Sequence, residues 1–242
     1  MLFFYLSLPP KSISDSVPLT LDTKITILRK TKKDKYMTYT ERGFSNACFS
    51  IFSYGYWNEK KGKYVMQTKP EMTQGIEWAY RWISSPMAAS GATIGYRAMM
   101  PTAAPAEKSE FKLKNFKYAT FAGTFEYRNA EGLIQRSPFM VLDIDGLASL
   151  DEACELRQRL SRDAKVETAL CFVSPSGRGV KWVFELPQWT MNQAYKRQFD
   201  MMRDYLGFNY GYNADTTGSD VCRACYLPYD PDCYVNPKYL SN

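Results

Sequence analysis

Two aspartates, Asp143 and Asp145, end a run of apolar residues that begins at Phe139. Side chains alternate along a strand with a period of two, so both carboxylates are expected on one face at the end of one strand. Two negative charges this close repel each other unless a cation lies between them. A strand that ends in an ordinary Asp-Gly turn would explain Asp145 and Gly146, but it leaves Asp143 unexplained. The pair therefore predicts a divalent metal site.

A glycine-rich segment at 174–179 supplies the groups that a phosphate needs. Glycines let backbone N–H groups approach closely, and serine and basic side chains add hydrogen bonds and positive charge. The candidate phosphate-binding residues are Ser176, Gly177, Arg178, Gly179 and Lys181. Such a segment on its own is most often only a loop between two strands. Beside a carboxylate pair it favours phosphoryl or nucleotidyl transfer, in which metals bridge carboxylates and phosphates.

A third polar group lies at 213–223. Asp215 or Asp220 could complete a three-carboxylate metal site, and Arg223 could hold a phosphate. A polar turn in which one arginine pairs locally accounts for the same residues. The sequence leaves the choice between the two aspartates open.

Hydrophobic periodicity and capping signals predict the elements that position these groups. From residue 139 onward the order is strand, helix, strand, strand, helix, strand, which is the ferredoxin-like arrangement of an α+β protein. The predicted ranges are strand 139–145, helix 150–162, strands 168–173 and 180–186, a helix from a cap at Thr190 to about Leu206, and strand 222–228. In this arrangement the fourth strand flanks the first, so the two aspartates are expected beside Lys181, Asp220 and Arg223.

The first 118 residues are predicted to form a smaller αβ unit that packs on this half, residues 119–242, within one domain. Strands are expected at 1–6, 21–28 and 120–128, and a helix at 71–83. Residues 87–110 contain small residues and prolines and are predicted to be a long surface connection. More than half of the Lys and Arg residues lie in this first half, which suits a polyanionic partner, although a solvated basic surface explains the charge equally well.

The composition excludes several kinds of chemistry. The 242 residues contain no histidine, which removes serine-histidine and cysteine-histidine hydrolases. The six cysteines are expected to be reduced, and Cys222, Cys225 and Cys233 offer three zinc ligands without a fourth. The apolar opening segment meets Pro9 too early for a signal peptide or a membrane span, so we expect a cytoplasmic protein that makes no membrane contact.

The Asp-Ile-Asp strand, the Ser-Pro-Ser-Gly-x-Gly-x-Lys segment and the Asp-x4-Asp-x-x-Arg segment together resemble the three-motif core of archaeo-eukaryotic-type primases and primase-polymerases. Within that superfamily the chain is most similar to the VirE N-terminal domain of mobile-element proteins. Residues 120–128 upstream, and 225–231 and 234–237 downstream, resemble stretches that flank the core in that domain. The resemblance extends over residues 115–240.

This resemblance implies an RRM-like catalytic half and a metal-dependent nucleotidyltransferase that acts on single-stranded DNA or RNA during replication of a mobile element. The implied ligands of two Mg²⁺ or Mn²⁺ ions are Asp143, Asp145 and either Asp215 or Asp220. The nucleoside triphosphate would be held by the candidate phosphate-binding residues and Arg223, with Lys181 roughly where many members carry histidine. A helicase is expected to act in trans. The basic residues expected to follow the template backbone are Lys24, Arg29, Lys30, Lys32, Lys33 and Lys35.

Two other functions fit parts of the sequence. Haloacid-dehalogenase-type phosphatases also carry an Asp-x-Asp-Gly motif after a strand, but they usually have threonine where Leu147 stands, and the predicted order of elements does not suit their doubly wound sheet. A non-catalytic nucleic-acid-binding module of the same fold would account for the missing histidine. The presence of both Asp143 and Asp145 favours an active site over such a module.

Overall fold

The computed structural model describes residues 47–186 and 193–241, all of them within the second of two compact units, Tyr36–Asn242. The strands predicted at 1–6 and 21–28 and the six basic residues from Lys24 to Lys35 lie outside the described residues. The helix cap predicted at Thr190 also lies outside them.

The sheet that carries the two aspartates has four strands in the order β12-β9-β10-β8, and each strand is antiparallel to its neighbours. The strands are β8 (Phe139–Asp145), β9 (Thr168–Val173), β10 (Gly179–Glu185) and β12 (Tyr234–Val235). Helix α4 (Leu150–Ser161) connects β8 to β9, and β10 lies between these two strands. The predicted side-by-side placement of the first and third strands is therefore confirmed.

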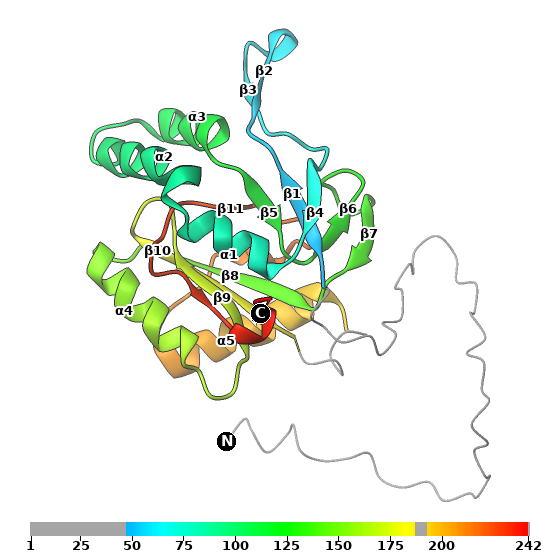
Figure 1. Ribbon diagram of the computed structural model, residues 1–242, viewed down its shortest axis with the longest axis vertical. Coiled ribbons are helices and arrows are strands. Elements are labelled where there is room, and N and C mark those ends of the chain that lie inside the picture. The colour runs from blue at the N-terminus through cyan, green and yellow to red at the C-terminus, as the bar shows by residue number, and fades with distance from the viewer. Residues whose placement is uncertain (1–46, 187–192, 242) are drawn as a thin grey trace, which may run out of the picture. The chain divides into compact units, whose positions relative to one another are not determined.

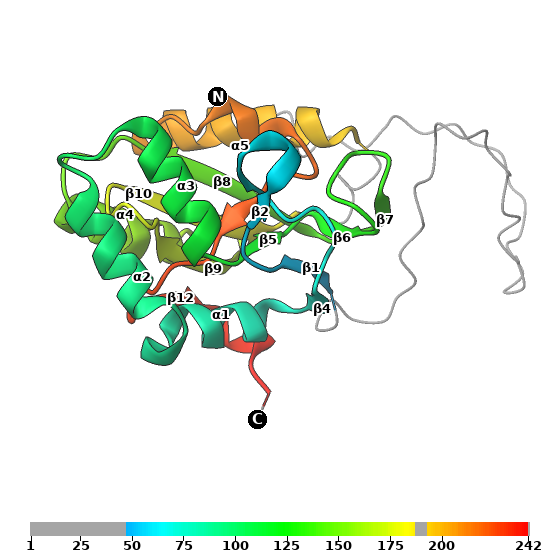
Figure 2. The same ribbon diagram turned by 90° about the horizontal axis from the view of Figure 1, so that it is seen from above.

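The alternation of side chains along β8 separates two cores. Met140, Leu142 and Ile144 pack with residues of α4 and of α5 (Tyr195–Tyr210). Phe139 and Val141 pack instead with residues of α1 (Ile76–Ser84) and of a second sheet. Figure 2 shows α5 and α1 on opposite sides of the strands. Asp143 and Asp145 continue the series of Phe139 and Val141, so they lie on the face turned away from α4 and α5.

The second sheet has the order β11-β5-β1-β4 and corrects the position predicted for the last strand. Its strands are β1 (Phe49–Phe52), β4 (Met72–Gln74), β5 (Tyr118–Thr120) and β11 (Cys225–Tyr226). We expected β11 beside β8, but it pairs antiparallel with β5. The physical reason is burial, because the Tyr226 ring packs edge-on against Phe116 and Tyr118.

The predicted surface connection at 87–110 is wrong, because it forms two helices, α2 (Pro86–Met99) and α3 (Pro105–Asn115). Pro86 and Pro105 each lie in the first turn of their helix. Backbone N–H groups there make no hydrogen bond within the helix, so proline loses none, and its fixed φ is already helical. The Ser85 hydroxyl accepts from the backbone N–H of Met87, and the Glu107 carboxylate accepts from that of Ala104. Pro86 and Pro105 therefore begin helices and do not interrupt them, while Pro101 lies in the turn between α2 and α3.

Three predicted boundaries also move. Helix α5 continues past Gly207 to Tyr210, because the left-handed cap is supplied by Gly211 at φ 77°. Residues 72–74 form β4 and not the first turn of a helix. The strand predicted at 120–128 divides into β5 and β6 (Gly123–Phe125), which pairs with β7 (Leu133–Arg136).

Two short strands, β2 (Tyr56–Asn58) and β3 (Lys63–Val65), form a separate hairpin that stands out from the body of this unit (Figure 1). Within the described residues, none of the helices has the length and apolar character needed to cross a membrane.

Candidate metal and phosphate site

Three carboxylates, Asp143, Asp145 and Asp215, converge at the end of β8, and we call them the carboxylate cluster. One oxygen from each lies within 4.8 Å of the others. Asp215 reaches this position because its backbone N–H donates to the carbonyl oxygen of Asp143 at 2.8 Å, which ties its loop to the strand end. Hard divalent cations prefer such carboxylate oxygens, so the cluster fits Mg²⁺ or Mn²⁺.

Lys181 lies opposite Asp143 in the register of β10 and β8, and its ammonium group pairs with the Asp143 carboxylate. The distance from Lys181 Nζ to Asp145 Oδ1 is 3.9 Å. The lysine side chain is almost fully buried, and this burial lowers its pKa to about 8. The cluster therefore has one internal positive charge that partly compensates its three negative charges.

The other two carboxylates have pKa values displaced in opposite directions. Burial, and then the charge of Asp215, raise the pKa of Asp145, against the opposing charges of Lys112 and Arg223. Burial also acts to raise the pKa of Asp215, but hydrogen bonds from Thr217 and the nearby Arg223 outweigh it and lower that pKa. Asp215 therefore ionises more readily than an ordinary aspartate and Asp145 less readily, and a bound cation would favour the ionised form of both.

The geometry distinguishes the two aspartates that the sequence left open. Asp215 belongs to the cluster, and its Oδ2 accepts from a guanidinium nitrogen of Arg223 at 2.8 Å. The Asp220 carboxylate accepts from the backbone N–H and the thiol of Cys222, at 3.0 and 3.1 Å. Asp215 is therefore the better candidate for the third ligand, while Asp220 lines the cleft without belonging to the carboxylate cluster.

The predicted phosphate-binding segment forms a tight turn between β9 and β10. Gly177 has φ 73° and donates its N–H to the Ser174 carbonyl oxygen at 3.0 Å. The Ser176 hydroxyl lies 3.0 Å from the Ser174 hydroxyl and accepts from the N–H of Arg178 at 3.2 Å. A Cβ atom at Gly179 would lie 2.6 Å from an Asp145 carboxylate oxygen. Only glycine at this position brings the turn so close to the carboxylate cluster.

A cleft of about 440 Å³ opens beside the cluster and the turn. Sequence reasoning missed the residues that line it from outside the segments predicted to form the site: Met66, Tyr96, Lys112, Arg128, Ala224 and Tyr226. Tyr96 comes from α2, inside the segment predicted to be a connection, and Lys112 comes from α3, which begins inside that segment and ends beyond it. The proline-initiated helices were the signal that could have revealed them.

Four basic side chains face the cleft, and we call Lys112, Arg128, Lys181 and Arg223 the basic wall. Burial lowers the pKa of Lys112, with the Asp145 charge acting against that effect. The Nε atoms of Arg128 and Arg223 are buried and make no hydrogen bond within the described part of the chain. Buried donors of this kind are normally satisfied, and an anionic ligand in the cleft would satisfy them.

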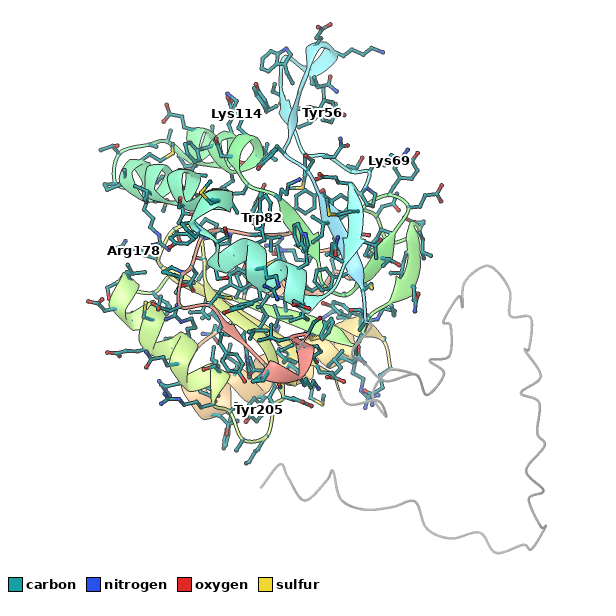
Figure 3. The ribbon with its side chains drawn as sticks, viewed as in Figure 1. Tyr56, Lys69, Trp82, Lys114, Arg178 and Tyr205 are labelled. Atoms are coloured by element: carbon teal, nitrogen blue, oxygen red, sulfur yellow. The ribbon has the colours of Figure 1, made fainter. Side chains whose placement is uncertain are left out.

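The remaining residues predicted for the site are not found in the cleft. Arg178 is exposed at the edge of the molecule, as Figure 3 shows, and does not line the cleft. The basic residues from Lys24 to Lys35 lie outside the described residues. Cys222, Cys225 and Cys233 are free thiols, and the carboxylate cluster is the metal-capable group found among the described residues.

Comparison with known proteins finds a match to a protein family. A family model described as "BT4734-like, N-terminal domain" matches residues 111–235, which include the carboxylate cluster, the turn and the basic wall. No curated protein and no solved structure is significantly similar to the chain. The matched range begins inside α3, so it contains Lys112 but not Tyr96.

Proposed function

The chain belongs to the BT4734-like N-terminal domain family, and from this premise we propose that it is a metal-dependent nucleotidyltransferase acting on single-stranded nucleic acid. The proposed reaction joins the α-phosphate of a nucleoside triphosphate to the 3′-hydroxyl of a strand and releases pyrophosphate. This is the activity of a primase or primase-polymerase, with replication of a mobile element and a helicase acting in trans as its proposed setting. The observation that carries the proposal is that two members of the carboxylate cluster, Asp143 and Asp145, line one cleft together with the basic wall.

The residues of the cleft have separable roles in this proposal. Divalent cations held by the carboxylate cluster would activate the attacking hydroxyl and stabilise the departing pyrophosphate. The basic wall neutralises the triphosphate, and the buried Nε atoms of Arg128 and Arg223 donate to its oxygens. The turn at 174–179 holds the phosphates close to Asp145, because Gly179 leaves no side chain between them. Arg223 also orients Asp215 through their hydrogen bond.

One observation favours a second candidate, a nucleic-acid-binding module of the same fold without catalysis. The ammonium group of Lys181 already pairs with Asp143, so the cluster has a partial counter-charge that needs no metal. Metal-dependent binding of a nucleoside triphosphate separates the two candidates. An active site loses this binding on Asp143→Asn, whereas a module without catalysis shows none to lose.

The phosphatase alternative receives no support from the fold. Its doubly wound sheet is built from parallel strands, but β8 pairs antiparallel with β10, and β10 with β9. Hydrolysis of a generic phosphate ester is therefore expected to be negligible.

The test of the proposed function is incorporation of labelled nucleotides on a single-stranded template with Mg²⁺ or Mn²⁺. We expect incorporation by the wild type and its loss in Asp143→Ala/Asp145→Ala. The matched control is Asp151→Ala/Glu155→Ala, which removes two exposed carboxylates of α4 and should leave incorporation unchanged. No incorporation by the wild type with either metal, with and without a primer, would contradict the proposal.

A further inference from the structure

The β2–β3 hairpin exposes large aromatic rings that no core uses. Tyr56 is 48% exposed and Trp57 is 50% exposed. The two residues are adjacent in β2, so their rings lie on opposite faces of the hairpin. Neither belongs to any of the hydrophobic clusters of the described residues. These two side chains therefore do not contribute to a hydrophobic core, and exposed apolar side chains of this size often mark a binding surface.

The Trp57 ring is held in place although it is exposed. Trp57 lies opposite Tyr64 in the register, and their ring centroids are 5.5 Å apart in an edge-on arrangement. The ammonium group of Lys114, at the end of α3, lies 4.1 Å from the centroid of the Tyr64 ring. Figure 3 shows Lys114 and Tyr56 at this end of α3 and the adjoining hairpin. Because the Trp57 ring is already positioned by Tyr64, a planar ligand that stacks on it meets a smaller entropic cost.

The tip of the hairpin is basic. Lys60, Lys61 and Lys63 are all exposed, and Glu59 is the one acidic residue between Tyr56 and Val65. The short helical turn at Glu59–Lys61 is closed by Gly62 in the left-handed region, which brings the lysines together within a few residues. Exposed ammonium groups beside exposed aromatic rings match the two chemical parts of a single-stranded nucleic acid, its phosphates and its bases.

The base of the hairpin adjoins the cleft. Gly55 donates its N–H to the carbonyl oxygen of Leu113 in α3 at 2.6 Å. The neighbouring residue in α3 is Lys112, a member of the basic wall, and the residue after β3 is Met66, which also lines the cleft. The hairpin is therefore within reach of the nucleotides that adjoin a strand end in the cleft.

We propose that the β2–β3 hairpin, with the end of α3, is a contact surface for single-stranded nucleic acid. Trp57 on one face of the hairpin and Tyr56 on the other each stack on unpaired bases, while Lys60, Lys61 and Lys63 contact phosphates. The inference rests on the proposed function, because it assigns the partner of that cleft to a particular surface. Stacking is not specific for one sugar, so the surface accepts DNA or RNA.

The test is the affinity of the full chain for fluorescein-labelled single-stranded DNA and RNA of the same mixed sequence, measured by fluorescence anisotropy without metal or nucleotide. Tyr56→Ala/Trp57→Ala is expected to weaken binding about tenfold or more, because each stacked base contributes on that order. Trp57→Phe should retain most of the affinity. Phe208→Ala, which removes an exposed aromatic ring from α5, is the matched control and should bind as the wild type does.

The contribution of the three lysines is tested by the salt dependence of single-strand binding. Removing Lys60, Lys61 and Lys63 together should reduce the slope of log affinity against log salt concentration by about 2, since each phosphate contact to a single strand contributes about 0.7. Thermal unfolding of each variant confirms that the exposed substitutions leave the fold intact.

The outcomes separate this inference from the proposed function. Hairpin-dependent binding without nucleotide incorporation by the wild type would support the hairpin surface and contradict the nucleotidyltransferase. Incorporation by a wild type whose hairpin variants bind unchanged would overturn the hairpin surface alone, and the exposed rings would then be candidates for contact with a protein. Absence of single-strand binding by the wild type would also overturn the inference.

Discussion

Lys181 and Asp143 occupy directly opposed positions on β10 and β8, and their side chains form an ion pair inside the candidate metal site. Both side chains are largely buried, with 9% and 16% of their surface exposed. A buried ion pair contributes little net stability, but loss of one partner leaves the other charge uncompensated. The pair therefore links the stability of the fold to the charge state of the site.

Lys181→Met is expected to destabilise the protein by about 3 kcal/mol, because three carboxylates remain without their internal positive charge. Divalent metal should restore much of this lost stability. A ligand that binds only the folded protein stabilises it by about 2.7 kcal/mol when its concentration is 100 times its Kd. Urea unfolding with and without Mn²⁺ measures both effects. Lys238→Met is the control, because Lys238 pairs with Glu167 and Glu185 away from the cleft and should show no rescue by metal. Equal responses of the two variants to Mn²⁺ would contradict the assignment.

Asp215→Asn should weaken Mn²⁺ binding at least tenfold, whereas Asp220→Asn should change it less than about threefold. The reason is geometric, because an Asp215 oxygen lies in the carboxylate cluster and Asp220 is engaged by Cys222. A tenfold change corresponds to about 1.4 kcal/mol, well within the contribution of one charged ligand. Calorimetric titration with Mn²⁺ measures the two affinities. The reverse order would make Asp220 the third ligand.

Gly179→Ala should lower stability by about 1–3 kcal/mol and weaken metal binding, because the new Cβ would lie 2.6 Å from both Asp145 Oδ1 and the Ile144 carbonyl oxygen. Gly91→Ala in α2 is the matched control. Nothing lies within 4 Å of its added Cβ, so the same substitution should be neutral or stabilise the helix by up to about 1 kcal/mol. Thermal unfolding and Mn²⁺ titration compare the pair. Wild-type metal affinity in Gly179→Ala would show that the turn can move away from Asp145.

Arg97→Ala should weaken binding of a nucleoside triphosphate about fivefold and leave Mn²⁺ affinity unchanged. Arg97 Nε donates to the Pro175 carbonyl oxygen at 3.4 Å and lies 3.2 Å from the position that a Cβ of Gly177 would occupy. It therefore positions the turn without reaching the carboxylate cluster, and loss of one hydrogen bond costs about 1 kcal/mol. Anisotropy of a fluorescent nucleoside triphosphate measures the effect. Arg81→Ala, an exposed arginine of α1, is the control.

The environment of Asp163 predicts how the stability of the fold depends on pH. Burial acts to raise its pKa, but hydrogen bonds from Tyr210, Tyr205 and the N–H groups of Lys165 and Val166 outweigh it and lower the pKa below the ordinary 3.8. The ionised carboxylate thus stabilises the fold fully above the unfolded-state pKa, and this contribution is lost as the pH falls through the folded-state pKa.

Asp163→Asn should therefore reduce stability at pH 7, and its deficit relative to the wild type should shrink as the pH falls below 3.8. Urea unfolding between pH 7 and pH 3 measures this difference. Asp204→Asn, on the exposed surface of α5, should show no such convergence. A deficit that stays constant with pH would mean that the hydrogen-bond geometry, and not the charge, stabilises this position.

The sequence by itself determined the features that depend on neighbouring residues. The period of two along β8 placed Asp143 and Asp145 on one face. Local capping signals predicted the start of α4, where the Ser149 hydroxyl accepts from the N–H of Glu152. The strand ranges of β9 and β10 followed from the same local signals. These features are readable because side-chain direction and backbone capping are set within a few residues.

Only the tertiary structure decided which distant segments meet. It placed β11 beside β5 and not beside β8, selected Asp215 over Asp220 for the cluster, and brought Lys112 and Arg128 to the cleft. These outcomes depend on which surfaces are buried against each other, as in the packing of Tyr226 on Phe116 and Tyr118. Burial of that kind is a property of the whole fold, and no local pattern of residues carries it.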